Sequence, residues 1–170
     1  MKIEKGFYYS FKLKFRKQEE QGVVIDEGED WILTKYIFSD YMVDGFMLFN
    51  KKFIKTIERG ENEIFFEKVL SANYKMDLPS RLSIPLSTKK LMKWLKDTET
   101  PFQIDGKDES VCYIGRILEI LNKSIRFKDI SAKGIWADGY DLYRMDSLMM
   151  ISFDTDYINS IIIYANSLKE

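Results

Sequence analysis

Apolar and polar residues alternate with a period of two along several short stretches of this chain. Residues 7–16 show the pattern most clearly, in the run Phe-Lys-Leu-Lys-Phe-Arg. Such alternation predicts a β-strand with one buried face. By pattern and by bounding turn residues, further strands are predicted over residues 22–25, 31–38, 46–49, 53–57, 111–121, 124–130, 135–136, 140–143, 148–153 and 160–165.

Helical spacing of apolar residues occurs in two places. Residues 62–74 have this spacing, and the predicted helix starts near Gly60. A second helix is predicted over residues 89–97, behind the capping pair Ser87-Thr88. Near the end of the chain, Asp154 is predicted to cap a single helical turn.

The predicted elements recur in order, which indicates an internal repeat. From Gly22 and again from Gly115, an apolar run, a second strand and an Asp-Gly turn follow each other with a single one-residue slip. The predicted fold class is α+β, with two related small SH3-like or Sm-like β-barrels joined by a helical connector. The expected division is a first unit at residues 1–75, a proline-containing connector at 76–101, and a second unit at 102–170.

Three segments support a resemblance to known proteins. They are the Asp-Gly-aromatic-x-Leu-aromatic stretches at residues 44–49 and 138–143, and the run Phe-Asp-Thr-Asp-Tyr-Ile-Asn at 153–159. With these segments the chain resembles bacterial proteins of uncharacterised function that contain tandem SH3-like or Sm-like barrels. For Sm-like folds, the resemblance implies RNA binding only where the RNA-contacting loops are present, and such loops are not recognised here.

Composition narrows the functional classes. The 170 residues are 45% hydrophobic and 15% aromatic, with a net charge of −1, so a folded core is expected and no global field favours nucleic acid or membrane. A single cysteine rules out a disulfide framework within the chain and suits a reducing compartment. The first residues lead into no apolar segment. We therefore expect a cytoplasmic protein.

Catalytic and metal motifs are not found. The chain has no histidine, the usual base beside a serine or cysteine nucleophile and a common zinc ligand. Cys112, in the predicted strand 111–121, is expected to be a small buried residue. Neither glycine-rich phosphate-loop pattern occurs. The expectation is a non-enzymatic protein without cofactor or metal.

Protein binding is the function that remains best supported. Twelve Phe, ten Tyr and three Trp exceed the evident needs of two small cores, and aromatic residues dominate interface hot spots. We expect an interaction module, such as a bacterial inhibitor or immunity-type protein, whose acidic second half meets a basic partner. The candidate partner-binding residues are Trp136, Asp138, Tyr140, Asp141, Asp146, Asp154 and Asp156.

The alternative is an Sm-like RNA-binding protein. Its candidate contacts are Tyr9, Lys12, Lys14 and Arg16, since a basic strip beside an aromatic ring can follow a phosphate backbone and stack a base. Lysines on the outer face of a strand also serve to prevent edge pairing. The acidic residues nearby in sequence would weaken the field of this strip.

Overall fold

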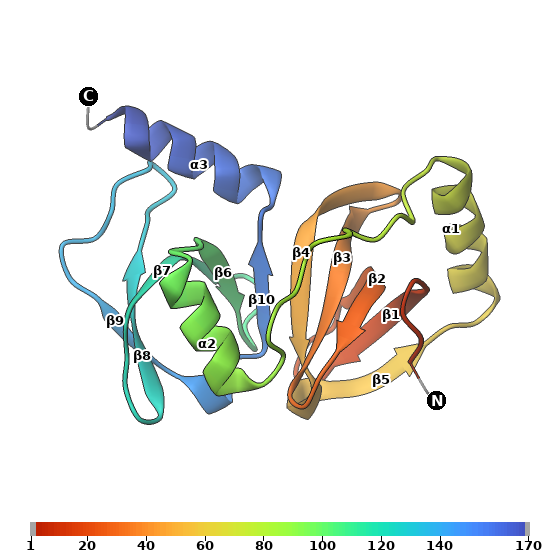
Figure 1. Ribbon diagram of the computed structural model, residues 1–170, viewed down its shortest axis with the longest axis horizontal. Coiled ribbons are helices and arrows are strands. Elements are labelled where there is room, and N and C mark those ends of the chain that lie inside the picture. The colour runs from red at the N-terminus through yellow and green to blue at the C-terminus, as the bar shows by residue number, and fades with distance from the viewer. Residues whose placement is uncertain (1–2, 169–170) are drawn as a thin grey trace.

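The computed structural model describes residues 3–168 and contains one antiparallel sheet of ten strands. The strand order is β5-β1-β2-β3-β4-β10-β6-β7-β8-β9. Figure 1 shows the sheet curling into two halves that stand side by side. The strands are β1 (Tyr8–Leu13), β2 (Glu19–Glu27), β3 (Trp31–Ser39), β4 (Met42–Asn50), β5 (Ile54–Glu58), β6 (Phe102–Asp105), β7 (Cys112–Ile120), β8 (Ser124–Asp129), β9 (Asp141–Arg144) and β10 (Met150–Phe153).

The same succession of elements occurs in both halves. Four strands form a meander, a short 3₁₀ turn follows at Lys51–Phe53 or Met145–Ser147, and a fifth strand returns to pair with the first. A helix then follows each fifth strand: α1 (Glu61–Ala72) follows β5 and α3 (Asp156–Ser167) follows β10. The third helix, α2 (Thr88–Asp97), lies between the halves in sequence.

Strands β4 and β10 join the two halves, and we call their pairing the seam. Phe46 pairs with Phe153 and Leu48 with Ile151 across it. The predicted fold class is therefore wrong: the chain forms a single open sheet instead of two barrels joined by a helical connector. Two closed barrels would pair β4 with β5 in the first half and β9 with β10 in the second half. In this sheet β4 pairs with β10 instead, and β5 and β9 remain as its two edge strands. The division expected at residues 75 and 101 stays a prediction.

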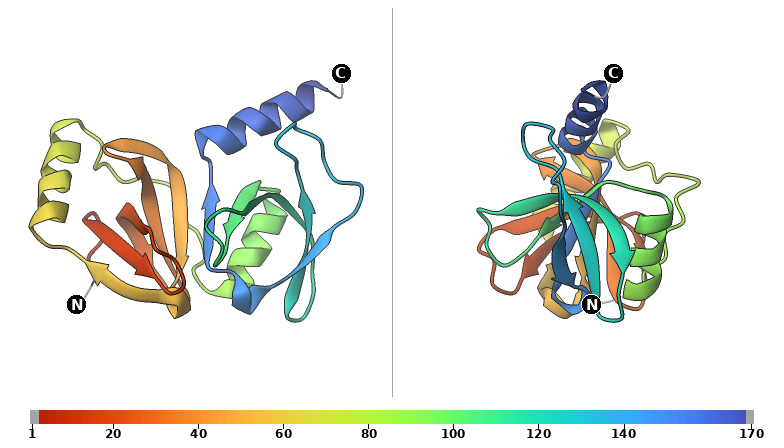
Figure 2. Two further views of the ribbon diagram at one scale, coloured as in Figure 1. Left: turned by 180° about the vertical axis from the view of Figure 1, so that it is seen from behind. Right: turned by 90° about the vertical axis from the view of Figure 1, so that its left-hand side faces the viewer.

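A shared hydrophobic core lies on one side of the seam. Trp31 from β3 packs in the same cluster as Phe127 and Ile151 of the second half and Leu91 of α2. Helix α2 packs mainly against β7, so it is part of the folded core as well as the connection between the two halves in sequence. Figure 2 shows it lying against the second half from two further directions. A separate cluster fills the first half, where the rings of Phe11 and Phe49 stack with centroids 4.4 Å apart.

The helices predicted near 62–74 and 89–97 are confirmed as α1 and α2. The last strand predicted at 160–165 is wrong, because this segment belongs to α3. Its cap is Thr155, whose hydroxyl accepts a hydrogen bond from the Ile158 amide, while Asp154 has a left-handed backbone with φ of 56°. Ile158 and Ala165 lie on one helical face and pack in a cluster with Ile114. Within residues 3–168, no helix is both long and apolar enough to cross a lipid bilayer.

Candidate functional site

A groove runs along the seam on the face that α2 does not cover. Strand alternation explains its position: Leu48 and Ile151 point into the core with α2, so their neighbours Met47, Met150 and Ser152 point to the other side. The hollow has a volume of about 790 Å³. Residues of both halves line it, and we call it the seam groove.

The rim of the seam groove carries large apolar side chains that are open to solvent. Phe38 and Met42 flank the β3–β4 turn and are 63% and 60% exposed, and Tyr157 at the start of α3 is 53% exposed. Asp40 makes this turn tight with a left-handed φ of 46°. Exposed apolar groups that gather at a hollow, with polar groups around them, are typical of a binding surface.

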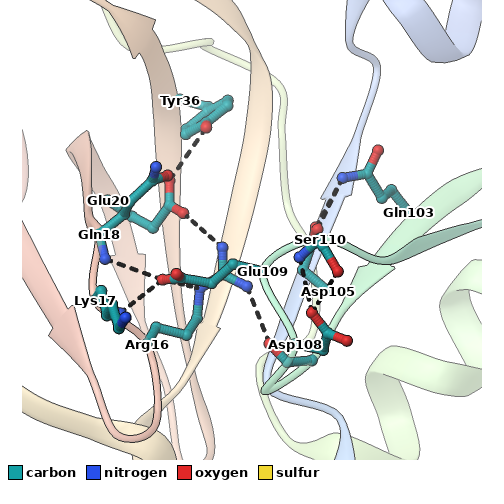
Figure 3. A network of polar contacts seen from close by, with 11 residues as sticks. Arg16, Lys17, Gln18, Glu20, Tyr36, Gln103, Asp105, Asp108, Glu109 and Ser110 are labelled. Carbon is teal, nitrogen blue, oxygen red and sulfur yellow. Dashed lines mark hydrogen bonds and ion pairs between the residues drawn. The ribbon is translucent and has the colours of Figure 1, made fainter.

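The polar end of the groove centres on Arg16, which follows β1. Its side chain is only 6% exposed, and one terminal nitrogen donates to Glu20 Oε1 at 3.3 Å. The other terminal nitrogen donates to the carbonyl of Gly106 in the second half, at 3.0 Å. Glu20 also accepts a hydrogen bond from the Tyr36 hydroxyl at 3.1 Å. Figure 3 shows these contacts joining the two halves.

The loop between β6 and β7 adds a second tie to the first half. Glu109 Oε1 accepts hydrogen bonds from the amides of Lys17 and Gln18, at 2.7 and 2.9 Å, and lies 3.9 Å from Arg16 Nε. In Figure 3, the Glu109 side chain reaches across to the turn that follows β1. The groove is thus closed at this end by a fixed network, and a partner would meet a preformed site.

Burial dominates the electrostatics of the carboxylates in the groove. It raises the pKa of Glu20, although Arg16 and the Tyr36 hydroxyl act in the opposite direction. It also raises the pKa of Asp105, against hydrogen bonds from the Gln103 amide and the charge of Arg16. The carboxyl groups of Glu20 and Asp105 therefore bind protons more tightly than usual, because burial in the groove reduces the hydration of their charged forms.

The lining of the groove carries excess negative charge. Among the residues that the structure describes, Arg16 is the one basic residue of the lining, and Glu20 and Glu109 already neutralise it. Asp44, Asp105 and Asp156 also line the groove, and none of them forms an ion pair with a basic side chain within residues 3–168. Asp44 instead accepts a hydrogen bond from the Asp156 amide at the first turn of α3.

Reactive chemistry in the groove is limited. Cys112 is an exposed residue that begins β7 and lines the groove, so the expected burial of its side chain is wrong. Partial shielding of its thiol from water and the nearby Asp105 raise the pKa of Cys112, which keeps the thiol protonated and weakly nucleophilic. Among the described residues, no cluster of three or more acidic or cysteine side chains is placed to hold a metal ion.

The candidate acidic residues lie in several places. Asp146 precedes β10, whereas Asp154 and Asp156 follow it, so they sit at opposite ends of this strand. Only Asp156 lines the seam groove. Asp141 begins β9, the free edge of the second half, and Asp138 lies in the bend before this strand.

The two aromatic candidates, Trp136 and Tyr140, precede β9. Trp136 is half-buried beneath the Arg116 guanidinium, which lies 4.8 Å from its ring centroid. Tyr140 is 49% exposed, with Arg126 at the same distance of 4.8 Å from its ring. Neither residue belongs to the seam groove.

The four candidate nucleic-acid-binding residues do not form a continuous basic surface, because packing and polar contacts within the protein engage their side chains. Tyr9 is only 3% exposed, so its ring is not available to stack on a base. Lys12 lies 3.7 Å from the carboxylate of Glu19. Lys14 is exposed and donates to the Lys52 carbonyl, and the Arg16 side chain is buried in the seam network.

Several groove residues escaped the sequence analysis, namely Phe38, Met42, Asp44, Asp105 and Tyr157. Phe38 and Met42 flank the polar pair Ser39-Asp40, and this arrangement is the one local signal of a hairpin tip. No local signal shows that the start of α3 stands across from this tip. The chain matches no protein-family model, no curated protein and no solved structure with significance.

Proposed function

We propose that this protein is a non-catalytic, cytoplasmic protein-binding module that captures its partner in the seam groove. One observation carries the proposal: Phe38, Met42 and Tyr157, each more than half exposed, stand at the rim of one preformed hollow. Burying such side chains against a partner contributes about 1.5–3 kcal/mol each when burial is complete. Aromatic and methionine side chains are enriched in interfaces for this reason.

The form of this function that we favour is an inhibitor of the immunity type. A rigid groove with excess negative charge supports it, because such a site steers a basic partner into place and loses little entropy on binding. The single cysteine, exposed and unpaired, suits the cytoplasm that the proposal assigns.

The test is affinity capture from the native host with the variant Phe38→Ser. The chain offers a close control in Phe65→Ser, on α1. Phe65 is 57% exposed and Phe38 is 63% exposed, and each ring has one edge-on aromatic neighbour, at 6.2 and 6.3 Å. We expect a stoichiometric partner that is retained by the wild type and by Phe65→Ser and is lost with Phe38→Ser.

Two results would count against the proposal. Equal capture by both variants would show that the rim of the seam groove makes no contact with the partner. Capture of RNA in place of protein, released as salt is raised, would assign the chain to nucleic-acid binding.

A further inference from the structure

We infer that the seam groove recognises one arginine or lysine side chain of its partner, flanked by apolar residues, and that Asp105 is the acidic group that receives it. This inference rests on the proposed protein-binding function and names the chemistry of the partner segment. It places a cationic head on the polar floor of the groove and apolar neighbours against the rim.

Charge complementarity is the first argument. The cation of Arg16 is already shared between Glu20 and Glu109, at 3.3 and 3.9 Å. Asp105 is half-buried, and within residues 3–168 its side chain accepts hydrogen bonds only from Gln103 Nε2, at 3.0 and 2.8 Å. Asp105 feels the charge of Arg16 but forms no ion pair with a basic side chain within residues 3–168, and an incoming guanidinium or ammonium would supply a direct partner.

The shape of the lining is the second argument. Asp105 lies on β6 next to β10, and it pairs with Met150 across the sheet. Met47 and Met150 line the floor beside the carboxylate but are only 3% and 1% exposed, so the accessible apolar surface of the lining comes from Val43 and Met42, which are 38% and 60% exposed. Long basic side chains pack their methylene stems on such a surface and extend the charged head to a polar group beyond it.

The residues at the rim determine which side chains can flank the basic residue of the partner. Phe38 and Met42 stand on the β3–β4 hairpin of the first half, and Tyr157 stands on α3 of the second half. A segment lying in the groove therefore has exposed apolar surface available from both halves. Methionine side chains adapt their shape, so this surface accepts different aliphatic or aromatic neighbours.

The stability of the free protein gives the third argument. Burial raises the pKa of Asp105 and of Glu20, which means that their charged forms cost folding free energy at neutral pH. Groups that reduce stability in this manner are concentrated at binding and catalytic sites. A bound cation would lower both pKa values again.

The experiment titrates the protein with two synthetic tripeptides, acetyl-Leu-Arg-Leu-amide and its citrulline analogue. Citrulline keeps the size and shape of arginine but has no charge. Binding is followed by amide chemical shifts in ¹⁵N-labelled protein and by the rate at which iodoacetamide alkylates Cys112. This cysteine is the only one in the chain, and it lines the groove.

We expect the arginine peptide to shift the amides of residues 38–43, 103–105 and 156–157 and to slow alkylation of Cys112. The citrulline peptide should bind at least about fivefold more weakly, because it leaves Asp105 without a cation. Asp105→Asn should weaken the arginine peptide by a similar factor while keeping an acceptor for Gln103. Asp97→Asn, a change at an exposed residue of α2 outside the groove, should leave binding unchanged.

Three outcomes would overturn the inference. They are equal binding of the two peptides, shifts confined to residues outside the groove, and no binding of either peptide at millimolar concentration. None of them removes the proposed function, since loss of a captured partner with Phe38→Ser is measured separately. A thermal melt of Asp105→Asn shows whether the variant is folded, and we expect it to be at least as stable as the wild type.

Discussion

The two Asp-Gly pairs of the chain, at residues 44–45 within β4 and at residues 138–139 before β9, allow a sharp test of the seam. Gly45 and Gly139 occupy the same place in the two related segments at 44–49 and 138–143. A Cβ added at Gly45 would lie 2.5 Å from the carbonyl oxygen of Asp154 and 2.6 Å from that of Phe153. A Cβ added at Gly139 would meet no atom of residues 3–168 within 4 Å.

We therefore expect Gly45→Ala to be strongly destabilising and Gly139→Ala to be nearly neutral. Gly45 has a φ of +67°, which costs an alanine about 1–2 kcal/mol. The clash adds about 1–3 kcal/mol, because the atoms in contact are backbone and can move only if β4 and β10 separate. The total, about 2–5 kcal/mol, corresponds to a fall in Tm of roughly 4–20 °C in a chain of this size.

The assay is urea unfolding followed by circular dichroism, with both variants measured against the wild type. We expect the midpoint to fall for Gly45→Ala with little change in the slope, which reports the surface exposed on unfolding. Gly139→Ala should stay within about 0.5 kcal/mol of the wild type. A Gly45→Ala variant as stable as Gly139→Ala would refute the close approach of the backbone at residues 153–154 to Gly45 in β4.

Three further predictions concern charge and helix capping. Burial and the neighbouring carboxylate of Asp141 raise the pKa of Asp129 from 3.8 to about 7. The folded state therefore binds this proton more tightly than the unfolded state, and the stability of the protein should fall as pH rises from about 4 to 7. Asp129→Asn should remove that fall, about 1 kcal/mol after solvent screening, in thermal melts across this range. Thr155→Ala should cost about 1 kcal/mol in urea unfolding, whereas Ser87→Ala should cost less, because only the threonine makes a side-chain cap hydrogen bond. Arg16→Met should cost about 3–5 kcal/mol in the same assay, since it leaves Glu20 buried without its cation.

Local pattern was sufficient for the elements whose packing follows their own sequence. The alternation in residues 7–16 corresponds to β1, and the helical spacing after Gly60 corresponds to α1. The end of the chain shows the limit of this approach. Three consecutive isoleucines, Ile161 to Ile163, favour a strand by their β-branched shape, yet tertiary packing of Ile158 and Ala165 makes the segment a helix.

The seam and the seam groove could not be predicted from local sequence patterns, for a different reason. Pairing of β4 with β10 joins residues about a hundred positions apart, and the alternation within each strand is the same whichever edge it pairs with. The groove combines the turn after β1, the β3–β4 hairpin, β6 and the start of α3. The sequence shows that Glu20 and Asp105 are acidic, but only their placement at the seam makes them neighbours of one arginine.

The open sheet has a consequence for self-association. The seam pairs the fourth strand of one half with the fifth strand of the other, and the free edges are β9, again a fourth strand, and β5, again a fifth. Copies joined through these edges in the seam's register would assemble head to tail, into a ring where the rotation between copies closes and into an open fibre where it does not. In that register Asp141, the counterpart of Met47, would face Glu58, the counterpart of Ser152. Two carboxylates directly opposite each other repel. The edge strands β9 and β5 of two copies therefore disfavour the kind of pairing that β4 and β10 form at the seam.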